Sequence, residues 1–326
     1  VNTLLHGKDG RIIGDNTDLF GFAWMLARFC ERHLGGRDAL RGAKALVLGS
    51  GGASKAIVAA LEDVSATPVV ISRQGGDTYE TIAESHADAS LIVNTTPVGM
   101  YPNCPASPLV PGTIERLASL RGVIDVVYNP ERTGIMLDAD RLGIPAESGL
   151  VMLVGQAWLS SSMWQGRELD EELIGSIESD LMRQCRNVAL IGMPGSGKTS
   201  AGRNLAELCG RTFVDMDVDF SERYGRKPAD VINEDGEQTF RRMETEALAE
   251  VAKRSSLVIS CGGGVVTRPE NLPLLRQNST VVMIDRKAEE LSSRGRPISQ
   301  QRGIQALAAE RMPLYRAWAD TVVSCT

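Results

Sequence analysis

"LIGMPGSGKTSAG", Leu190 to Gly202, decides the fold of the second half of the chain. It fits the pattern G-x-x-x-x-G-K-S/T, follows the apolar run "VALI" and opens the helix-forming run "TSAGRNLAEL". Glycines let backbone amides close around phosphate oxygens, Lys198 can reach the β- and γ-phosphates, and the Thr199 hydroxyl can bind Mg²⁺. The nucleotide-binding residues predicted here are Gly192, Gly195, Ser196, Gly197, Lys198 and Thr199.

A second glycine loop, in "LVLGSGGASKA" from Leu46 to Ala56, has a different pattern. It follows the strand-like "ALVL" and precedes "KAIVAALE", and it is a variant of the dinucleotide-binding fingerprint with a small residue at the last glycine position. The next strand-like run ends in Arg73, where an NAD enzyme usually carries an acidic residue; an arginine there can hold the 2′-phosphate of NADP. The cofactor-binding residues predicted for NADP are Gly49, Gly51, Gly52, Ala53 and Arg73.

Short apolar runs alternate with helix-length segments along the whole chain. The runs are "KALVLG", "TPVVIS", "SLIVNT", "GVIDVV", "NVALIG", "TFVDMD", "SLVISCGG" and "TVVMID". This alternation predicts the α/β class: a Rossmann-like dinucleotide-binding domain followed by a P-loop domain, each with a parallel sheet. We place the first domain at 1–165, a charged helical linker at 166–186 and the P-loop domain at 187–326.

The composition of the chain limits the classes of partner and the compartment that we expect. A chain of 326 residues favours two domains, and a net charge of -6 argues against nucleic acid or an acidic membrane surface as a partner. The six cysteines are scattered, as in reduced intracellular proteins, so we expect a cytoplasmic protein. The three histidines (His6, His33 and His86) are expected at the surface, and none suggests a zinc site. The sequence does not indicate an oligomeric state.

The acceptor of a phosphoryl group needs its own residues. "FVDMDVDF" places Asp215 and Asp217 two apart, which predicts that both point to one side at the end of a strand. Arg241 and Glu244 lie at i, i+3 on one helix face. Gly262 to Gly264 leave the backbone open to a close ligand. Arginines farther along are candidates for phosphate and carboxylate clamps, namely Arg294, Arg296 and Arg311.

In order, the P-loop, "D-x-D", "DGEQ-x-FRR-x-E", "S-x-GGG-x-V" and "R-x-PLY" over 187–326 resemble shikimate kinase. The resemblance implies that MgATP phosphorylates shikimate at its 3-hydroxyl. By position it implies catalytic roles for Asp217, Lys198 and Arg296, and Mg²⁺ contacts for Thr199, Asp215 and Ser260. The substrate-binding residues it implies are Asp217, Arg241, Gly263 and Arg311. The lid between Arg296 and Arg311 is short for the family, and the family's C-terminal helix is missing.

In the first half, "VNTLL…GRIIGDNTDLFGF", "IVNTTPVGMYP", "VIDVVYNPERT" and "GLVMLVGQA" resemble shikimate dehydrogenase. The resemblance implies substrate contacts by Asn2, Asp18, Gln156 and Tyr128, with Asp18 as the catalytic aspartate. Leu19 replaces a usual glycine, and Asp77 replaces a basic residue, which predicts weaker binding of the 2′-phosphate. The family's N-terminal substrate domain and its catalytic lysine are absent, so we expect a fragment.

Together the two resemblances predict a fused pair of successive enzymes: 3-dehydroshikimate is reduced to shikimate with NADP, and shikimate is then phosphorylated with ATP. Two alternatives remain open. One is an active kinase beside a non-catalytic NADP-binding module. The other is a kinase for another small polyol acid such as gluconate, which the arginine set and "DGEQ-x-FRR" oppose. The partners expected are small molecules.

Overall fold

The computed structural model describes residues 1–7, 9–73, 77–287, 291 and 303–324. The chain forms two compact units, an N-terminal unit of Val1–Arg183 and a C-terminal unit of Gln184–Thr326. The segment 166–186, which we set apart as a linker, contains helix α6 (Glu172–Cys185), and most of that helix belongs to the N-terminal unit. Ile174 of α6 is fully buried in that unit's core.

A five-stranded sheet with the order β4-β3-β5-β6-β7 forms the centre of the N-terminal unit. Every neighbouring pair in it is parallel, which confirms the predicted α/β class. Four strands match the apolar runs of the sequence, whereas the short strand β7 was not predicted. The bounds are β3 Lys44–Leu48, β4 Thr67–Ile71, β5 Leu91–Asn94, β6 Gly122–Asp125 and β7 Ala146–Ser148.

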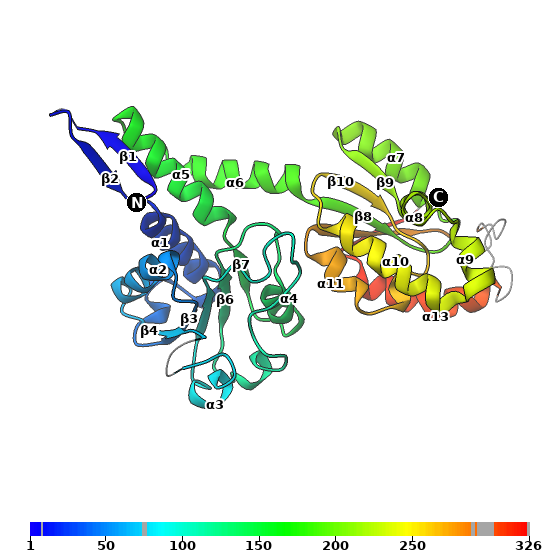
Figure 1. Cartoon of the computed structure of the whole chain (residues 1–326), viewed down its shortest axis with the longest axis horizontal. Coiled ribbons are helices and arrows are strands. Elements are labelled where there is room, and N and C mark those ends of the chain that lie inside the picture. Colours follow the sequence, from blue (N-terminus) through cyan, green and yellow to red (C-terminus); the bar gives the residue numbers. More distant parts are fainter. Residues whose placement is uncertain (8, 74–76, 288–290, 292–302, 325–326) are drawn as a thin grey trace. The chain divides into compact units, whose positions relative to one another are not determined.

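Helices cover both faces of this sheet (Figure 1). Successive residues of β3 show this division, because Val47 belongs to one core cluster and Leu48 to another. Side chains alternate between the faces of a strand, so a strand buried on both faces is apolar throughout. The principal helices are α1 (Asp18–Phe29), α2 (Gly52–Asp63), α4 (Gly134–Arg141) and α5 (Leu150–Gln165).

A separate antiparallel hairpin precedes α1 in the N-terminal unit. It pairs β1 (Thr3–His6) with β2 (Ile12–Asp15), and Thr3 lies opposite Asp15. The side chains of Leu4, Ile12 and Ile13 are exposed on it. The hairpin is held beside the sheet domain where Asn2 and Thr3 meet α1 and α5, and by a hydrogen bond from Trp164 of α5 to the carbonyl oxygen of Leu4.

The C-terminal unit has a second parallel sheet, with the order β12-β11-β8-β10-β9. β8 lies at its centre, between β11 and β10, so the loop after β8 opens where the strand order reverses. In parallel sheets ligands bind at the carboxyl ends of strands near such a reversal. The bounds are β8 Asn187–Ile191, β9 Thr212–Asp215, β10 Leu257–Ser260, β11 Ser279–Asp285 and β12 Thr321–Ser324.

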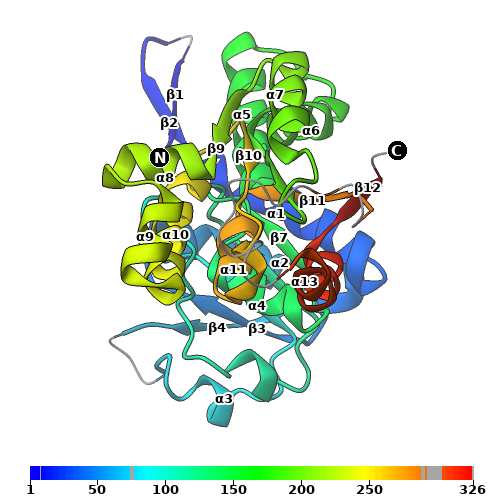
Figure 2. The ribbon, with the colours of Figure 1, turned by 90° about the vertical axis from the view of Figure 1, so that its right-hand side faces the viewer.

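Helices α7, α8, α9, α10 and α13 of the C-terminal unit contribute residues to the site, whereas α11 does not. Helices α9 and α10 lie side by side in both views (Figure 2). The bounds are α7 Lys198–Cys209, α8 Met216–Tyr224, α9 Pro228–Asp235, α10 Glu237–Ala252, α11 Asn271–Arg276 and α13 Ile304–Trp318. None of the helices in the described part of the chain has the length and apolar content needed to span a bilayer.

Candidate active sites

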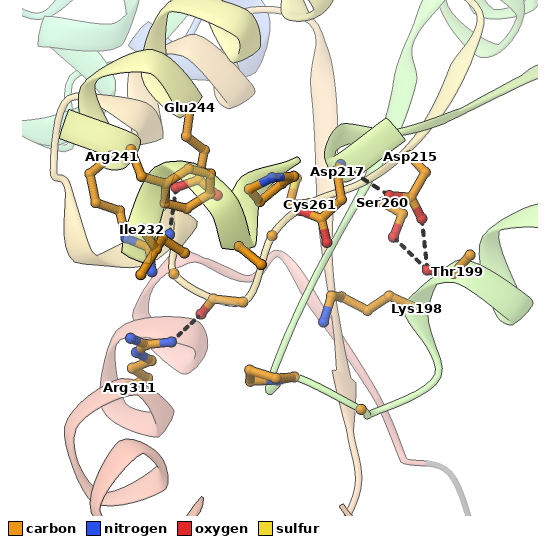
Figure 3. Close-up of a pocket in the computed structure, with 18 of the residues that line it drawn as sticks. Lys198, Thr199, Asp215, Asp217, Ile232, Arg241, Glu244, Ser260, Cys261 and Arg311 are labelled. Atoms are coloured by element: carbon orange, nitrogen blue, oxygen red, sulfur yellow. Dashed lines mark hydrogen bonds and ion pairs between the residues drawn. The ribbon is translucent and has the colours of Figure 1, made fainter. Parts of the chain in front are cut away.

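Most of the residues predicted for the phosphoryl acceptor and for the nucleotide line one pocket of about 320 Å³ in the C-terminal unit (Figure 3), although Gly192 and Ser196 do not. Its walls come from the loop after β8, the start of α7, the β9–α8 junction, α9, α10, the loop after β10 and α13. Of the predicted site residues, the lining includes Gly195, Gly197, Lys198, Thr199, Asp215, Asp217, Arg241, Ser260, Gly263 and Arg311. Arg294 and Arg296 lie outside the described residues.

The loop after β8 is folded into a phosphate cradle. Gly192, Gly195 and Gly197 all have positive φ values (140°, 84° and 97°), which residues with side chains rarely adopt. A Cβ added to Gly192 would lie 2.5 Å from the carbonyl oxygen of Ile284. The Nζ of Lys198 donates to the carbonyl oxygens of Gly192 and Met193, each at 2.9 Å, so the lysine itself holds the loop in shape.

Ser196 supports the assignment of this loop. Its side chain is fully buried, and its Oγ has no hydrogen-bond partner among the described residues. A buried hydroxyl without a partner is costly, so such groups commonly face a ligand or a water. The position of Ser196 inside the cradle, one residue before Gly197, fits a nucleotide phosphate as that partner.

Three oxygen ligands suitable for Mg²⁺ meet at the carboxyl edge of the sheet. The Thr199 hydroxyl donates to Oδ2 of Asp215 at 2.8 Å and lies 3.5 Å from the Ser260 hydroxyl. They come from the start of α7, the end of β9 and the end of β10. Mg²⁺ prefers oxygen ligands and keeps several waters, so two hydroxyls and one carboxylate fit this ion.

Asp217 is not on a strand, and our prediction that it follows Asp215 along one was wrong. The chain turns at Asp215, which ends β9 and caps α8 by accepting the backbone N–H of Asp217 at 3.1 Å. An aspartate is a strong helix cap, and this favours the helix over a longer strand. Asp217 therefore lies in the first turn of α8, where its side chain still lines the pocket.

The Asp217 carboxylate is set up to accept a proton near neutral pH. It lines the pocket and is exposed to solvent there, with the pocket walls around it. Burial raises the pKa of Asp217 to about 6; the negative charges of Asp215 and Glu244 add to the rise, and Lys198 and Arg241 oppose it. A general base works best when its pKa lies near the working pH.

Arg241 is buried and carries two acidic partners. Its Nη1 donates to Oε2 of Glu244 at 2.6 Å, as the i, i+3 spacing on α10 predicted, and its Nη2 donates to Glu237 at 3.2 Å. Two of the three glycines after β10 make room for these groups: a Cβ added to Gly264 would lie 2.0 Å from Cζ of Arg241. A Cβ on Gly262 would lie 2.3 Å from Oε1 of Glu244. The glycines thus accommodate the protein's own arginine and glutamate.

Arg311 is the most unusual charge in the pocket. Only 2% of it is exposed, and its Nη1 donates to the carbonyl oxygen of Gly263 at 3.2 Å. Within the described part of the chain its Nε and Nη2 have no hydrogen-bond partner, and the nearest carboxylate, Glu237, is 4.0 Å from Nη2. Burial lowers the pKa of Arg311. A buried cation with open donors is a receptor for an anion, such as a carboxylate.

In the N-terminal unit the structure brings Asn2, Asp18 and Gln156 together. The Nδ2 of Asn2 donates to Oδ1 of Asp18 at 2.9 Å and to Oε1 of Gln156 at 3.2 Å. Close contact of two helices makes this possible. A Cβ on Gly21 of α1 would lie 2.5 Å from the carbonyl oxygen of Met152 of α5, and a Cβ on Gly155 would lie 3.2 Å from Cα of Gly21.

Sequence reasoning missed the hydroxyl groups that hold Asn2. The Oδ1 of Asn2 accepts the backbone N–H of Thr17 at 2.9 Å, and the hydroxyl of Thr17 lies 3.1 Å from that of Ser160. The Thr3 hydroxyl lies 2.7 Å from the same Ser160 hydroxyl. Thr17 stood within the quoted "NTDLFG", so its position beside Asp18 was the available signal.

The dinucleotide loop is open on the side where a ligand would approach. Gly49 has a φ of 104°, and a Cβ there would lie 2.9 Å from Oγ1 of Thr95, which donates to the carbonyl oxygen of Leu48 at 2.7 Å. A Cβ at Gly51 or Gly52 would meet no atom within 4 Å. Helix α2 begins at Gly52, so its free amides point toward this loop. Ala53 is the small second residue of that helix.

The residues around the loop occupy different settings. Arg73, just after β4, is exposed, and Tyr128, in the loop after β6, is half-exposed. His86 is buried, so our prediction of a surface histidine was wrong at this position. Its Nε2 lies 3.0 Å from Oδ1 of Asp77, which gives that carboxylate a partner within its own unit.

A buried carboxylate beneath the loop was also missed. Asp125, at the end of β6, is fully buried and accepts hydrogen bonds from Asn94, from Thr133 at 2.6 Å and from the backbone N–H of Val127 at 2.9 Å. Burial raises the pKa of Asp125 to about 6, against the lowering effect of these hydrogen bonds. The sequence signal was an aspartate inside the apolar run "GVIDVV".

Known proteins resemble both units. The family model for shikimate kinase matches residues 194–326. The shikimate kinase of Dehalococcoides mccartyi is 36% identical over 44% of this chain and 86% of that protein. The shikimate kinase of Symbiobacterium thermophilum is 41% identical over 43% of this chain and 86% of that protein.

A solved structure matches the other part of the chain. It is a chorismate mutase/shikimate 5-dehydrogenase fusion protein from Clostridium acetobutylicum, with a TM-score of 0.50 and 32% sequence identity over 56% of this chain and 67% of that one. Since the kinase relatives match the C-terminal unit, the N-terminal unit carries this likeness. The chain therefore belongs to the shikimate kinase family through its C-terminal unit, and its N-terminal unit is similar to shikimate dehydrogenase.

Proposed function

We propose that the C-terminal unit transfers the γ-phosphoryl group of ATP to the 3-hydroxyl of shikimate. The observation that carries this proposal is the position of Arg311, a buried guanidinium with open donors in the same pocket as the phosphate cradle and Asp217. Shikimate offers both a carboxylate for the arginine and hydroxyls for the aspartate. Phosphoryl transfer depends on such positioning and on charge neutralisation more than on covalent chemistry by the protein.

Each end of the pocket has its own task in this proposal. Asp217 orients the attacking hydroxyl and takes its proton, while Arg241 and Arg311 hold the carboxylate and the Gly263 backbone lies against the ring. The backbone of the loop from Gly192 to Gly197 and the Lys198 ammonium bind the phosphates and stabilise the charge that develops during transfer. Arg296, outside the described residues, is proposed as a further catalytic contact to the ATP phosphates.

Thr199, Asp215 and Ser260 are the residues that would hold Mg²⁺. The bound ion neutralises charge on the β- and γ-phosphates. The protein's own part is the arrangement of these three side chains: the hydrogen bond from Thr199 to Asp215 fixes both before the nucleotide arrives. This leaves Asp217, which lies in the first turn of α8, for the acceptor side.

For the N-terminal unit we propose NADP binding and the reduction of 3-dehydroshikimate to shikimate. The open glycine loop at Gly51 and Gly52 takes the pyrophosphate, and Arg73 takes the 2′-phosphate. In this proposal Asp18, with Asn2 and Gln156, forms the polar cluster that meets the substrate. Tyr128 is assigned to the same substrate site, near the nicotinamide. The product of this reaction is the substrate of the kinase, so both steps belong to one sequence. We place them in the cytoplasm, in keeping with described cysteines that form no disulfide.

The test is shikimate-dependent release of ADP from the purified chain with MgATP. We expect release with shikimate and none with gluconate, because gluconate lacks the ring that fits between α9, α10 and Gly263. Equal turnover of both acids would favour the general polyol-acid kinase. Oxidation of shikimate with NADP, measured on the same sample, tests the N-terminal unit. NADP binding without oxidation would fit the non-catalytic module, and it would equally fit the expected absence of the family's catalytic lysine.

A further inference from the structure

Tyr315 lies behind the wall of the kinase pocket and does not line it. The side chain is fully buried, and its hydroxyl donates a hydrogen bond to the carbonyl oxygen of Gly263. Arg311 donates to the same oxygen from Nη1 at 3.2 Å. The two residues are four apart on α13, so they project from one face of that helix. One backbone oxygen therefore receives two side-chain donors from a single helix.

The peptide that carries this oxygen touches several functional groups. A Cβ on Gly263 would lie 2.6 Å from Cγ of Pro194 in the phosphate cradle, and a Cβ on Gly264 would lie 2.0 Å from the guanidinium carbon of Arg241. The loop thus runs between the cradle on one side and Arg241 on the other. When its carbonyl is fixed, the peptide plane cannot rotate, and the position of both arginines relative to the loop is fixed as well.

The hydroxyl is suited to a permanent donor role. Burial raises the pKa of Tyr315 far above its ordinary value, so the phenol keeps its proton at every working pH. The ring contributes separately, since it belongs to the apolar core that also holds Trp318 and Leu307. Removing only the oxygen therefore leaves the packing in place and isolates what the hydrogen bond does.

We propose that Tyr315 is a positioning residue for shikimate: its hydroxyl holds the Gly263 carbonyl so that Arg241 and Arg311 stand correctly spaced for the substrate carboxylate. The inference rests on the kinase function proposed above and assigns one further residue to the shikimate end of that site. Tyr315 acts through the Gly263 carbonyl oxygen, which it shares with Arg311.

The test uses initial rates of ADP release from the full chain, with shikimate and ATP each varied in turn. Tyr315→Phe is expected to raise the KM for shikimate about fivefold to tenfold, the effect of one hydrogen bond. The KM for ATP and kcat are expected to stay within about twofold, because the cradle keeps its own contacts. A merely structural role would instead lower kcat or raise both KM values together with a fall in Tm.

Tyr224→Phe is the matched control. The Tyr224 hydroxyl also donates to a backbone carbonyl, that of Met243 at 3.2 Å, and Tyr224 does not line the pocket. We expect it to leave both KM values unchanged. The methyl ester of shikimate, which lacks the carboxylate charge, is a second test substrate. Tyr315→Phe should raise the KM for the acid and leave the KM for the ester unchanged.

The outcomes separate the inference from the function on which it rests. An active wild-type enzyme whose KM for shikimate is unchanged by Tyr315→Phe overturns the inference alone, as does an equal effect on acid and ester. If the wild-type chain neither turns over shikimate nor binds it in calorimetry, the proposed function and the inference both fail. A rise in KM for shikimate but not for its ester in Tyr315→Phe, with no such rise in Tyr224→Phe, supports both the function and the inference.

Discussion

The two glycine loops of this chain share one local architecture and differ in what surrounds them. Each follows a strand inside a parallel five-stranded sheet, β3 or β8, and each opens a helix of 12 residues, α2 or α7. The loop before α7 is tied by Lys198, which binds two of the loop's own carbonyl oxygens. The loop before α2 has no charged residue between Gly49 and Ala53 and is open at Gly51 and Gly52.

This difference shows how similar backbones serve different ligands. A triphosphate that must react needs charge at the reacting end, and the loop before α7 faces carboxylates and arginines across one pocket. A dinucleotide needs only to be held along its pyrophosphate, which backbone amides can do alone. Selectivity in the N-terminal unit must then come from side chains outside its loop, and Arg73 is the nearest candidate.

Replacing the lysine is the severest test of this comparison. Lys198→Ala should lower kcat for phosphoryl transfer at least about 1000-fold. The substitution removes the positive charge that stabilises the transferred group and the two hydrogen bonds that hold the loop. ADP release with saturating shikimate and MgATP measures it. Lys253→Ala is the control, since that lysine pairs with Glu250 away from the pocket. Phosphoryl transfer close to the wild-type rate would mean that the lysine does not account for the functional difference between the two loops.

Removing the proton acceptor should have the next largest effect. Asp217→Asn is expected to lower kcat about 100-fold. In the wild type, kcat/KM should rise with pH through about 6, the pKa of Asp217, and level off above it, because the ionised form takes the proton. A profile without that rise would exclude Asp217 as the base.

The same substitution has a predictable effect on stability. A carboxyl whose pKa is raised by folding stabilises the folded state at low pH, and this contribution is lost as the pH rises through about 6. Above that pH the ionised Asp217 therefore costs stability. Asp217→Asn should raise the Tm of the C-terminal unit there, while it should change Tm less at acid pH.

The carboxylate clamp should matter less than the catalytic groups. Arg311→Met is expected to raise the KM for shikimate about 30-fold and to leave the KM for ATP unchanged, because a charge-assisted pair with the substrate is lost. A substitution of Arg311 is easier to interpret than one of Arg241, because the loss of Arg241 would leave the buried Glu244 carboxylate without this ion-pair partner. Arg316→Met, an exposed position on the same helix, is the control. An equal rise for both substrates would indicate misfolding.

The smallest effect should come from the open loop of the N-terminal unit. Arg73→Ala is expected to weaken the binding of NADP about tenfold and to leave the binding of NAD unchanged, because only the 2′-phosphate pairs with the guanidinium. The ratio of the two dissociation constants, from fluorescence titration, measures this. Arg41→Ala, another exposed arginine of this unit, should leave the ratio as it is. If Arg73→Ala also leaves it as it is, the N-terminal unit selects NADP by other residues.

The sequence predicted the sheets well because eight of their strands are short apolar runs. The central ones, such as β3, β5 and β10, are buried on both faces and are therefore apolar throughout. The edge strands β4 and β9 are only partly buried, yet they were recognisable as well. β7 (Ala146–Ser148) was missed because an edge strand of three half-buried residues, "AES", has no apolar pattern. Its assignment depends on pairing with β6, a contact that no local signal reports.

The site was predicted in its residue types and less well in its geometry. The spacing of Asp215 and Asp217 suggested a strand, yet the capping ability of Asp215 ends the strand there. The glycines after β10 suggested an open approach for a ligand, yet Arg241 and Glu244 fill much of that space. His86 is buried beside Asp77, because tertiary contacts decide burial for a residue of intermediate polarity.

The contact between Gly21 and Gly155 has a consequence for how this chain can vary. It sets the separation of α1 and α5, and with it the meeting of Asp18 and Gln156, although neither glycine has any chemistry of its own. A single added methyl group at Gly21 would push the two helices apart, and Asp18 on α1 would then move away from Gln156 on α5. The freedom of this candidate site to vary is therefore limited at Gly21 and Gly155, two positions that carry no reactive group.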